Sequence, residues 1–142
     1  GAFATDVQGI SGANIVGRYR NPDAIATYHG FIYDGVNFTT LDFPGATGTQ
    51  ALDIDGQNIV GVYRDSSFNQ HGFLFDGINW KSLNFPGAII TAISGISGNR
   101  IVGHYYDAAG DPHGFVAVIP EPITLALAVG TAIGMIAVRR RR

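Results

Sequence analysis

The stretch NIVGVYRDSSFNQHGFLFDGINWKSLNFPGA, residues 58–88, contains the three short motifs that decide the fold of this 142-residue chain. Ile-Val-Gly occurs at Ile15, Ile59 and Ile101, and His-Gly-Phe occurs at His29, His71 and His113. Phe-Pro-Gly-Ala occurs at Phe43 and Phe85, and Gly1-Ala2 align with the end of a further copy. Successive His-Gly-Phe motifs are 42 residues apart, and a fixed period of this size indicates a repeat protein.

Each repeat predicts about four short strands. Asp34-Gly35 and Asp76-Gly77 fit hairpin turns, because Gly readily takes positive φ and Asp tolerates it. A proline follows the fourth strand and donates no ladder hydrogen bond. The expected strands are residues 6–10, 50–54 and 92–96, the Ile-Val-Gly-x-Tyr segments, residues 30–33 and 72–75, and residues 37–43 and 79–85.

Four antiparallel strands in about 42 residues match one blade of a β-propeller, and three units of this length also match a β-trefoil. We predict an all-β domain over residues 1–118, a partial propeller with the trefoil as alternative, built from units 1–44, 45–86 and 87–118. The third unit leaves the pattern after Val116, so we expect no fourth strand there. A strand upstream of Gly1 is expected to complete the ring.

Composition narrows the class of protein. Charged residues make up only 14% of the chain and hydrophobic residues 46%. Before Ile119, ten Asp face five Lys or Arg, a net charge of −5, whereas the remainder has one Glu and four Arg, or +3. An acidic body is poorly suited to binding phosphate backbones, so we expect no nucleic-acid partner. The absence of cysteine excludes disulfides and thiolate chemistry.

Few side chains indicate a catalytic or metal site. His29, His71 and His113 recur at one place per repeat, which favours a ring nitrogen bonded to neighbouring backbone over metal binding, although a trefoil could bring the three to one axis. Asp53 and Asp55 resemble the start of a calcium loop, but the other repeats have Gly and Ser there, which favours turn chemistry. We therefore expect no metal, no cofactor and no enzymatic activity.

Aromatic side chains are the candidates for a ligand site. Trp80 and Phe38 occupy equivalent places in two repeats, and the loops after the Ile-Val-Gly strands vary in sequence. Repeated aromatics usually form the core between units, but they also stack on sugars. A glycan site that uses Trp80 and Phe38 is the alternative prediction.

The chain ends with VIPEPITLALAVGTAIGMIAVRRRR, residues 118–142. Residues 123–138 carry no charge, and the last four residues are Arg139, Arg140, Arg141 and Arg142. As a helix, residues 123–138 would span about 24 Å, somewhat less than the hydrocarbon core of about 30 Å. We predict a short transmembrane helix in residues 123–142, whose arginines stop it at the cytoplasmic face.

The order of Pro120-Glu121-Pro122, an apolar segment and terminal arginines resembles the PEP-CTERM sorting signal of Gram-negative bacteria. The resemblance implies export, transient residence in the inner membrane, processing by an exosortase that reads Pro120, Glu121 and Pro122 in segment 119–122, and delivery to the cell surface or extracellular matrix. The repeats resemble HAF-type extracellular repeats, in which Ala stands where this chain has the central Gly of His-Gly-Phe.

Together these features predict an exported surface or matrix protein with a structural or adhesive role. A carbohydrate-binding module and a non-catalytic part of a secreted hydrolase are the alternatives. The expected partners are the membrane, an exosortase-type processing enzyme and extracellular polysaccharide.

Overall fold

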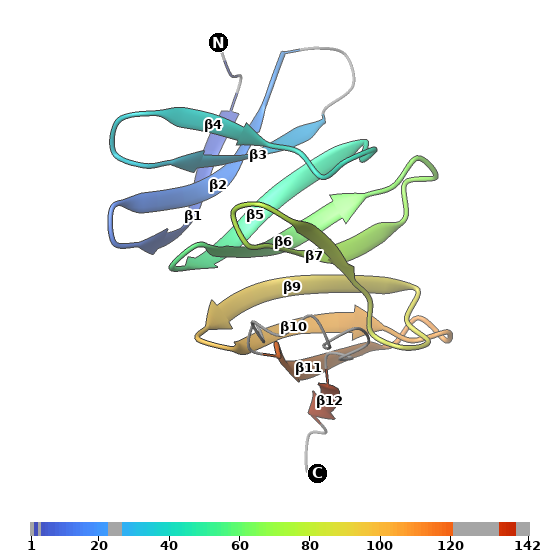
Figure 1. Cartoon of the computed structure of the whole chain (residues 1–142). Helices are drawn as coiled ribbons and strands as arrows, with labels where there is room; N and C mark the ends of the chain where they lie inside the picture. Colours follow the sequence, from blue (N-terminus) through green and yellow to red (C-terminus); the bar gives the residue numbers. More distant parts are fainter. Residues whose placement is uncertain (1, 3, 23–26, 121–133, 139–142) are drawn as a thin grey trace.

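The computed structural model of the chain describes residues 2, 4–22, 27–120 and 134–138. These residues form twelve β-strands and no helix (Figure 1). In particular, the described residues contain no helix with the length and apolar character that a membrane crossing requires.

The strands form three four-stranded antiparallel sheets, each a meander in which consecutive strands are neighbours. Sheet 1 contains β1 (Ala4–Ser11), β2 (Asn14–Arg20), β3 (Tyr28–Tyr33) and β4 (Phe38–Leu41). Sheet 2 contains β5 (Gly48–Asp55), β6 (Asn58–Arg64), β7 (Gln70–Phe75) and β8 (Trp80–Leu83). Sheet 3 contains β9 (Ile90–Ser97), β10 (Arg100–Tyr106), β11 (Pro112–Val118) and β12 (Gly134–Val138). The all-β prediction is confirmed.

The three sheets are stacked, with sheet 2 between the other two (Figure 1). The first strand of each following sheet lies against the sheet before it: β5 contacts β1, β2 and β3, and β9 contacts β5, β6 and β7. Backbone pairing stays within each sheet, so the described strands close no barrel. The β-trefoil alternative is therefore wrong.

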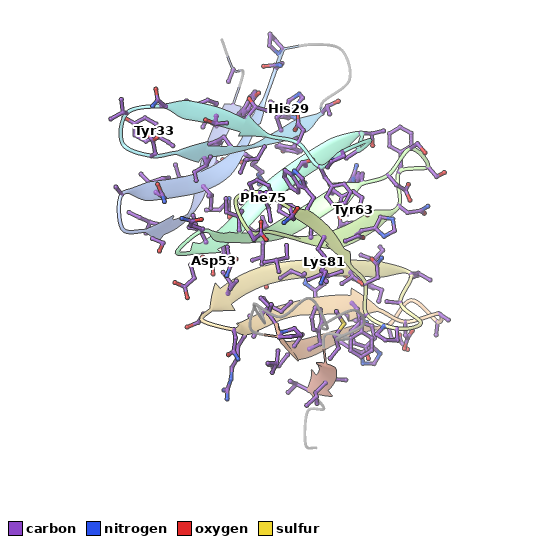
Figure 2. The ribbon with its side chains drawn as sticks, in the orientation of Figure 1. His29, Tyr33, Asp53, Tyr63, Phe75 and Lys81 are labelled. Carbon is purple, nitrogen blue, oxygen red and sulfur yellow. The ribbon has the colours of Figure 1, made fainter. Side chains whose placement is uncertain are left out.

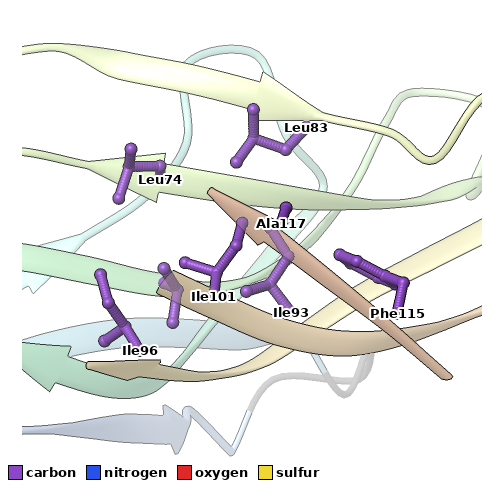
Figure 3. Close-up of a cluster of buried hydrophobic side chains, with 8 residues drawn as sticks. Leu74, Leu83, Ile93, Ile96, Ile101, Phe115 and Ala117 are labelled. Carbon is purple, nitrogen blue, oxygen red and sulfur yellow. The ribbon is translucent and has the colours of Figure 1, made fainter. Parts of the chain in front are cut away.

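Side chains of sheet 2 are buried on both faces. Ile59 and Val60 are adjacent in β6 and point to opposite sides, since neighbouring strand residues alternate. Ile59 belongs to the core between sheets 1 and 2, and Val60 to the core that reaches sheet 3. Figure 3 shows the second core, where Leu74 and Leu83 of sheet 2 meet Ile93 of β9.

A β-bulge explains the glycine of Ile-Val-Gly. The pairing register of β1, β5 and β9 with the following strand shifts by one residue at the same place in each sheet. The bulged strand brings a carbonyl oxygen over the glycine, so a Cβ at Gly61 would lie only 2.0 Å from the Gln50 oxygen. The corresponding distances are 2.1 Å at Gly17 and 2.0 Å at Gly103. No other residue fits these positions.

The Asp-Gly hairpins form as expected. Gly35 and Gly77 have φ values of +96° and +95°, which glycine adopts without strain. The Asp34 carboxylate accepts a hydrogen bond from the Asn37 amide at 2.6 Å, and Asp76 accepts one from Asn79 at 2.7 Å. These bonds lower the pKa of both carboxyl groups below the ordinary value.

The prediction for the end of the chain requires a correction. Residues 134–138, expected in a transmembrane helix, form β12 on the edge of β11, so the third sheet does have a fourth strand. Met135 packs on the core, whereas Ile136 and Val138 are exposed. Without β12, the backbone N–H and C=O groups on this edge of β11 would have no strand partner. An added antiparallel strand forms hydrogen bonds with them. The rest of the predicted helix, residues 123–133, lies outside the described residues, as do residues 139–142.

Candidate functional site

The histidines of the three His-Gly-Phe motifs stack on tyrosine rings. Register makes each histidine the cross-strand partner of the tyrosine in Ile-Val-Gly-x-Tyr. The ring centroids are 5.1 Å apart for Tyr19 and His29, 5.0 Å for Tyr63 and His71, and 5.0 Å for Tyr105 and His113. We call these pairs, with their polar partners, histidine clusters 1, 2 and 3.

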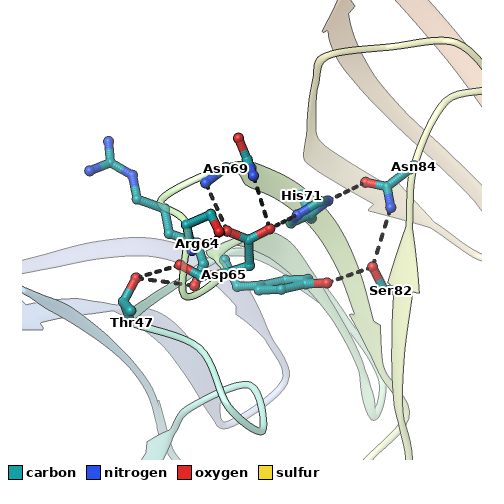
Figure 4. A network of polar contacts seen from close by, with 9 residues as sticks. Thr47, Arg64, Asp65, Asn69, His71, Ser82 and Asn84 are labelled. Atoms are coloured by element: carbon teal, nitrogen blue, oxygen red, sulfur yellow. Dashed lines mark hydrogen bonds and ion pairs between the residues drawn. The ribbon is translucent and has the colours of Figure 1, made fainter.

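Cluster 2 has the most extensive polar network (Figure 4). His71 Nε2 donates to Asp65 Oδ2 at 2.8 Å, and His71 Nδ1 lies 2.9 Å from Asn84 Oδ1. The Tyr63 hydroxyl lies 2.7 Å from Ser82 Oγ. Both nitrogens of His71 therefore have protein partners, which leaves neither one directed at a ligand.

Asp65 also organises the loop between β6 and β7. Its carboxylate accepts hydrogen bonds from the amides of Ser67 and Asn69, at 2.8 and 3.0 Å. The hydrogen bond from His71 is the largest cause that lowers the pKa of Asp65 to about 2. Asp107 has the same arrangement in cluster 3, where the hydrogen bond from His113 lowers its pKa. The carboxylates thus remain ionised and fix the histidine rings at neutral pH.

The prediction that the histidines bond backbone is wrong, since their partners are carboxylates and an amide side chain. His29 Nδ1 contacts Asp42 at 2.9 Å, while the other two histidines contact Asp65 and Asp107. Each histidine has its own carboxylate, and the described residues contain no group of three His, Cys, Asp or Glu placed to hold a metal ion.

A signal for these partners exists in the sequence and was missed. Asp65 and Asp107 each follow the strand tyrosine by two positions, whereas the first repeat has Asn21 there. At the position after the fourth strand the pattern is reversed, with Asp42 in the first repeat and Asn84 in the second. Each histidine therefore has one carboxylate partner. The carboxylate contacts Nδ1 in the first repeat and Nε2 in the other two repeats.

Asp53 and Asp55, which resemble the start of a calcium loop in sequence, connect sheets 2 and 3. Asp53 lies between the two sheets (Figure 2) and accepts a hydrogen bond from the Ile96 amide at 2.8 Å. Asp55 accepts one from the Gly98 amide at 2.5 Å. Ser11, the residue equivalent to Asp55, accepts one from the Gly56 amide at 2.9 Å and so joins sheets 1 and 2. In both places, a side-chain oxygen of one sheet accepts a hydrogen bond from the amide of a turn glycine in the next sheet. This hydrogen bond is a repeated connection between successive sheets.

The two candidate glycan residues have different surroundings. Trp80 is half-buried, stacks on Phe75 at 4.3 Å and meets the edge of Phe43 at 5.5 Å. Phe38 is 53% exposed and stacks on Phe31 at 4.8 Å. The structure places them in different sheets, at the start of β8 and β4. Only Phe38 presents a large part of its ring to solvent.

Two hollows border the loops and turns of sheets 2 and 3. A cavity of about 280 Å³ is lined by His71, Asn84, Phe85 and Thr91, among other residues. An open groove of about 700 Å³ lies at the turns of sheets 2 and 3, lined among others by Asp55, Asn99 and Pro120. The first cavity combines amide, imidazole and aromatic groups, and ligand pockets likewise join apolar or aromatic walls with a few polar groups.

The structure holds the start of the predicted sorting motif directly against the fold. The Ile119 amide donates to the Asn99 carbonyl at 2.6 Å, and Ile119 packs on the core. Pro120 follows as part of the groove wall. Glu121, Pro122 and the four arginines, Arg139, Arg140, Arg141 and Arg142, lie outside the described residues.

Comparison with known proteins adds no family. No protein-family model, curated protein or solved structure matches this chain.

Proposed function

We propose that this protein is a non-catalytic, structural or adhesive β-repeat protein, exported to the cell surface or extracellular matrix. The observation that carries the proposal is the use of its reactive side chains. Asp53 and Asp55 bind backbone amides of the next sheet, and the histidines bind carboxylates of their own sheet. Side chains that would serve a catalytic centre instead hold the array together.

The finer architecture that we propose is a partial β-propeller. Each four-stranded meander corresponds to one blade, and the first strand of sheet 2 and of sheet 3 lies against the preceding sheet. The repeated Ser11–Gly56 and Asp55–Gly98 hydrogen bonds support this view, because they give successive sheets the same relative placement. The same connections suit a stacked surface scaffold.

We further propose that the C-terminal segment is a sorting signal, processed by an exosortase-type enzyme at the inner membrane of a Gram-negative bacterium. Pro120, Glu121 and Pro122 are the recognition residues, and the terminal arginines remain cytoplasmic. Membrane engagement of residues 134–138 requires β12 to leave β11. The exposure of Ile136 and Val138 limits the apolar burial that this exchange gives up, and the backbone hydrogen bonds lost with β11 are replaced by those of a helix in the membrane.

Processing in a Gram-negative host that has an exosortase tests this proposal. Wild-type chain should yield a C-terminally shortened product in the surface or extracellular fraction, identified by mass spectrometry. Glu121→Ala should leave full-length chain in the membrane fraction, while Pro112→Ala, outside the motif, should behave as wild type. Deletion of residues 139–142 keeps β12 but removes the cationic stop, and it should abolish the membrane intermediate. Unchanged mass and location in all variants would refute export through this signal.

A carbohydrate-binding module is the second candidate, favoured by the exposed Phe38 ring and the cavity beside His71. An aromatic ring packs against the apolar C–H face of a sugar, and amide groups hydrogen-bond its hydroxyl groups. A glycan array separates this candidate from a scaffold. Saturable binding that Phe38→Ala removes, with folding intact by circular dichroism, supports the module. Trp80→Ala is the poorer test, because Trp80 packs on the core and its loss destabilises the fold.

A further inference from the structure

Sheets 2 and 3 are each entered through the same turn. In Phe-Pro-Gly-Ala, the Ala46 amide donates to the Phe43 carbonyl at 3.0 Å, and the Ala88 amide donates to the Phe85 carbonyl at 3.0 Å. Gly45 has φ +76°, the value required at the third position of a type II turn. The turn projects its phenylalanine over the sheet that follows.

That phenylalanine has two fixed partners. Phe43 stacks on Tyr63 with centroids 3.8 Å apart and rings 2° from parallel, and Phe85 stacks on Tyr105 at 3.8 Å and 3°. The Phe43 amide donates to Thr49 Oγ1 at 2.9 Å, and the equivalent bond from Phe85 is 3.0 Å long. Both accepting threonines, Thr49 and Thr91, are fully buried. A phenylalanine ring and an amide donor therefore complete the edge of sheets 2 and 3.

Sheet 1 has the same receiving groups. Tyr19 stacks on His29 as Tyr63 does on His71, and its hydroxyl lies 2.9 Å from Thr40 Oγ1. Thr5 is the residue equivalent to Thr49. Phe38, equivalent to Trp80, meets the edge of Tyr19 at 5.7 Å.

These groups differ from their counterparts in exposure. Thr5 is exposed, whereas Thr49 and Thr91 are 0% and 1% exposed, and no described residue donates a hydrogen bond to the Thr5 hydroxyl. Phe38 is 53% exposed, whereas Trp80 is half-buried beneath Phe43. The described part of sheet 1 thus has a tyrosine, a threonine and an aromatic ring arranged to receive a phenylalanine. We call Thr5, Tyr19 and Phe38 the receiving slot.

We propose that the receiving slot binds the phenylalanine of a Phe-Pro-Gly-Ala turn, in the way that sheets 2 and 3 bind Phe43 and Phe85. The ring stacks on Tyr19 and covers Phe38, and its amide donates to Thr5 Oγ1. Gly1-Ala2 align in sequence with the last two residues of such a turn, so a Phe-Pro dipeptide joined to Gly1 would restore the Phe-Pro-Gly-Ala motif just ahead of sheet 1.

The test is the full chain extended ahead of Gly1 by Leu-Asp-Phe-Pro, a copy of residues 41–44. The control is the chain extended by Leu-Asp-Ala-Pro. We expect the Phe extension to raise the folding equilibrium constant at least about tenfold over the control in urea titrations, because it buries a phenylalanine and adds one aromatic pair. The amide of the added phenylalanine should be protected from hydrogen exchange. Equal stability of the two extended chains would overturn the proposal.

Substitutions within the slot give a second, independent readout. Tyr19→Leu and Thr5→Val should each reduce the stability that the Phe extension adds, toward that of the Ala extension. Each substitution should lower the stability of the unextended chain by much less than it lowers the stability of the Phe-extended chain. A gain that survives both substitutions refutes the slot even if the extended chain is more stable.

Two other occupants are outcomes of the same set of experiments, and each would overturn the proposal. If a second copy of the chain occupies the slot, sedimentation will show concentration-dependent association that Phe38→Ala abolishes. If a sugar occupies it, titration of the unextended chain with soluble oligosaccharides will give saturable shifts of the Tyr19 ring resonances.

Discussion

Alanine in place of the central glycine of His-Gly-Phe should have opposite effects in the second and third repeats. A Cβ at Gly72 would lie 2.8 Å from Ile93 Cδ1 and 2.8 Å from the Leu83 carbonyl oxygen. Carbon atoms in contact normally lie 3.5–4.0 Å apart, so β9 must move away by several tenths of an ångström. Overpacking of this kind costs about 1–3 kcal/mol. At Gly114 the nearest atom, the Gly103 oxygen, is 3.9 Å away, which is ordinary contact.

Gly114→Ala should therefore leave the fold intact and stabilise it by up to about 1 kcal/mol, since Ala reduces the conformational entropy of the unfolded chain. The free energies of unfolding of the two variants should differ by about 1–4 kcal/mol. Urea titration followed by the fluorescence of Trp80, the single tryptophan, measures this difference, and circular dichroism checks that the transition is two-state.

Ile93→Val in the Gly72→Ala background provides the mechanistic control. It removes the methyl group nearest the new Cβ, so the double variant should be less destabilised than the sum of the two single variants. If Gly114→Ala costs as much as Gly72→Ala, the close approach of β9 to the second repeat is not the reason for glycine at this position, and the stacking of sheets 2 and 3 is wrong.

Three further predictions concern single side chains. Phe68 has φ +65°, where the third repeat has Gly110, so Phe68→Gly should stabilise the fold by about 0.5–1 kcal/mol in thermal unfolding, whereas Phe68→Ala keeps the strain and should give no gain. Thr49→Val leaves the Phe43 amide without an acceptor and should cost about 1–3 kcal/mol in urea, against almost nothing for the exposed Thr39→Val. The folded pKa of Asp65, about 2, is below its unfolded value, so its stabilising effect is present above about pH 4 and is lost as the pH falls toward 2. Asp65→Asn should flatten acid unfolding curves in this range, and Asp111→Asn, which meets no histidine, should not.

Much of the fold follows from local patterns. Asp-Gly and Phe-Pro-Gly-Ala specify their turns through the φ values that Gly and Pro allow, so the strands between them are predictable from residues close in sequence. The sequence therefore predicted the repeat, the four-stranded units and the all-β class. It also contained the histidine partners, in the alternation of Asp42 with Asn84, but that pattern is meaningful only once strands β3 and β4 are known to be adjacent.

The tertiary structure decided what depends on surfaces far apart in sequence. The three repeats look alike, yet only sheet 2 is buried on both faces, because it alone has a described neighbour on each side. The apolar residues of segment 134–138 are compatible both with a helix in lipid and with a strand on an open sheet edge. The unpaired backbone of β11 determines the choice here, and no local pattern in the tail encodes it.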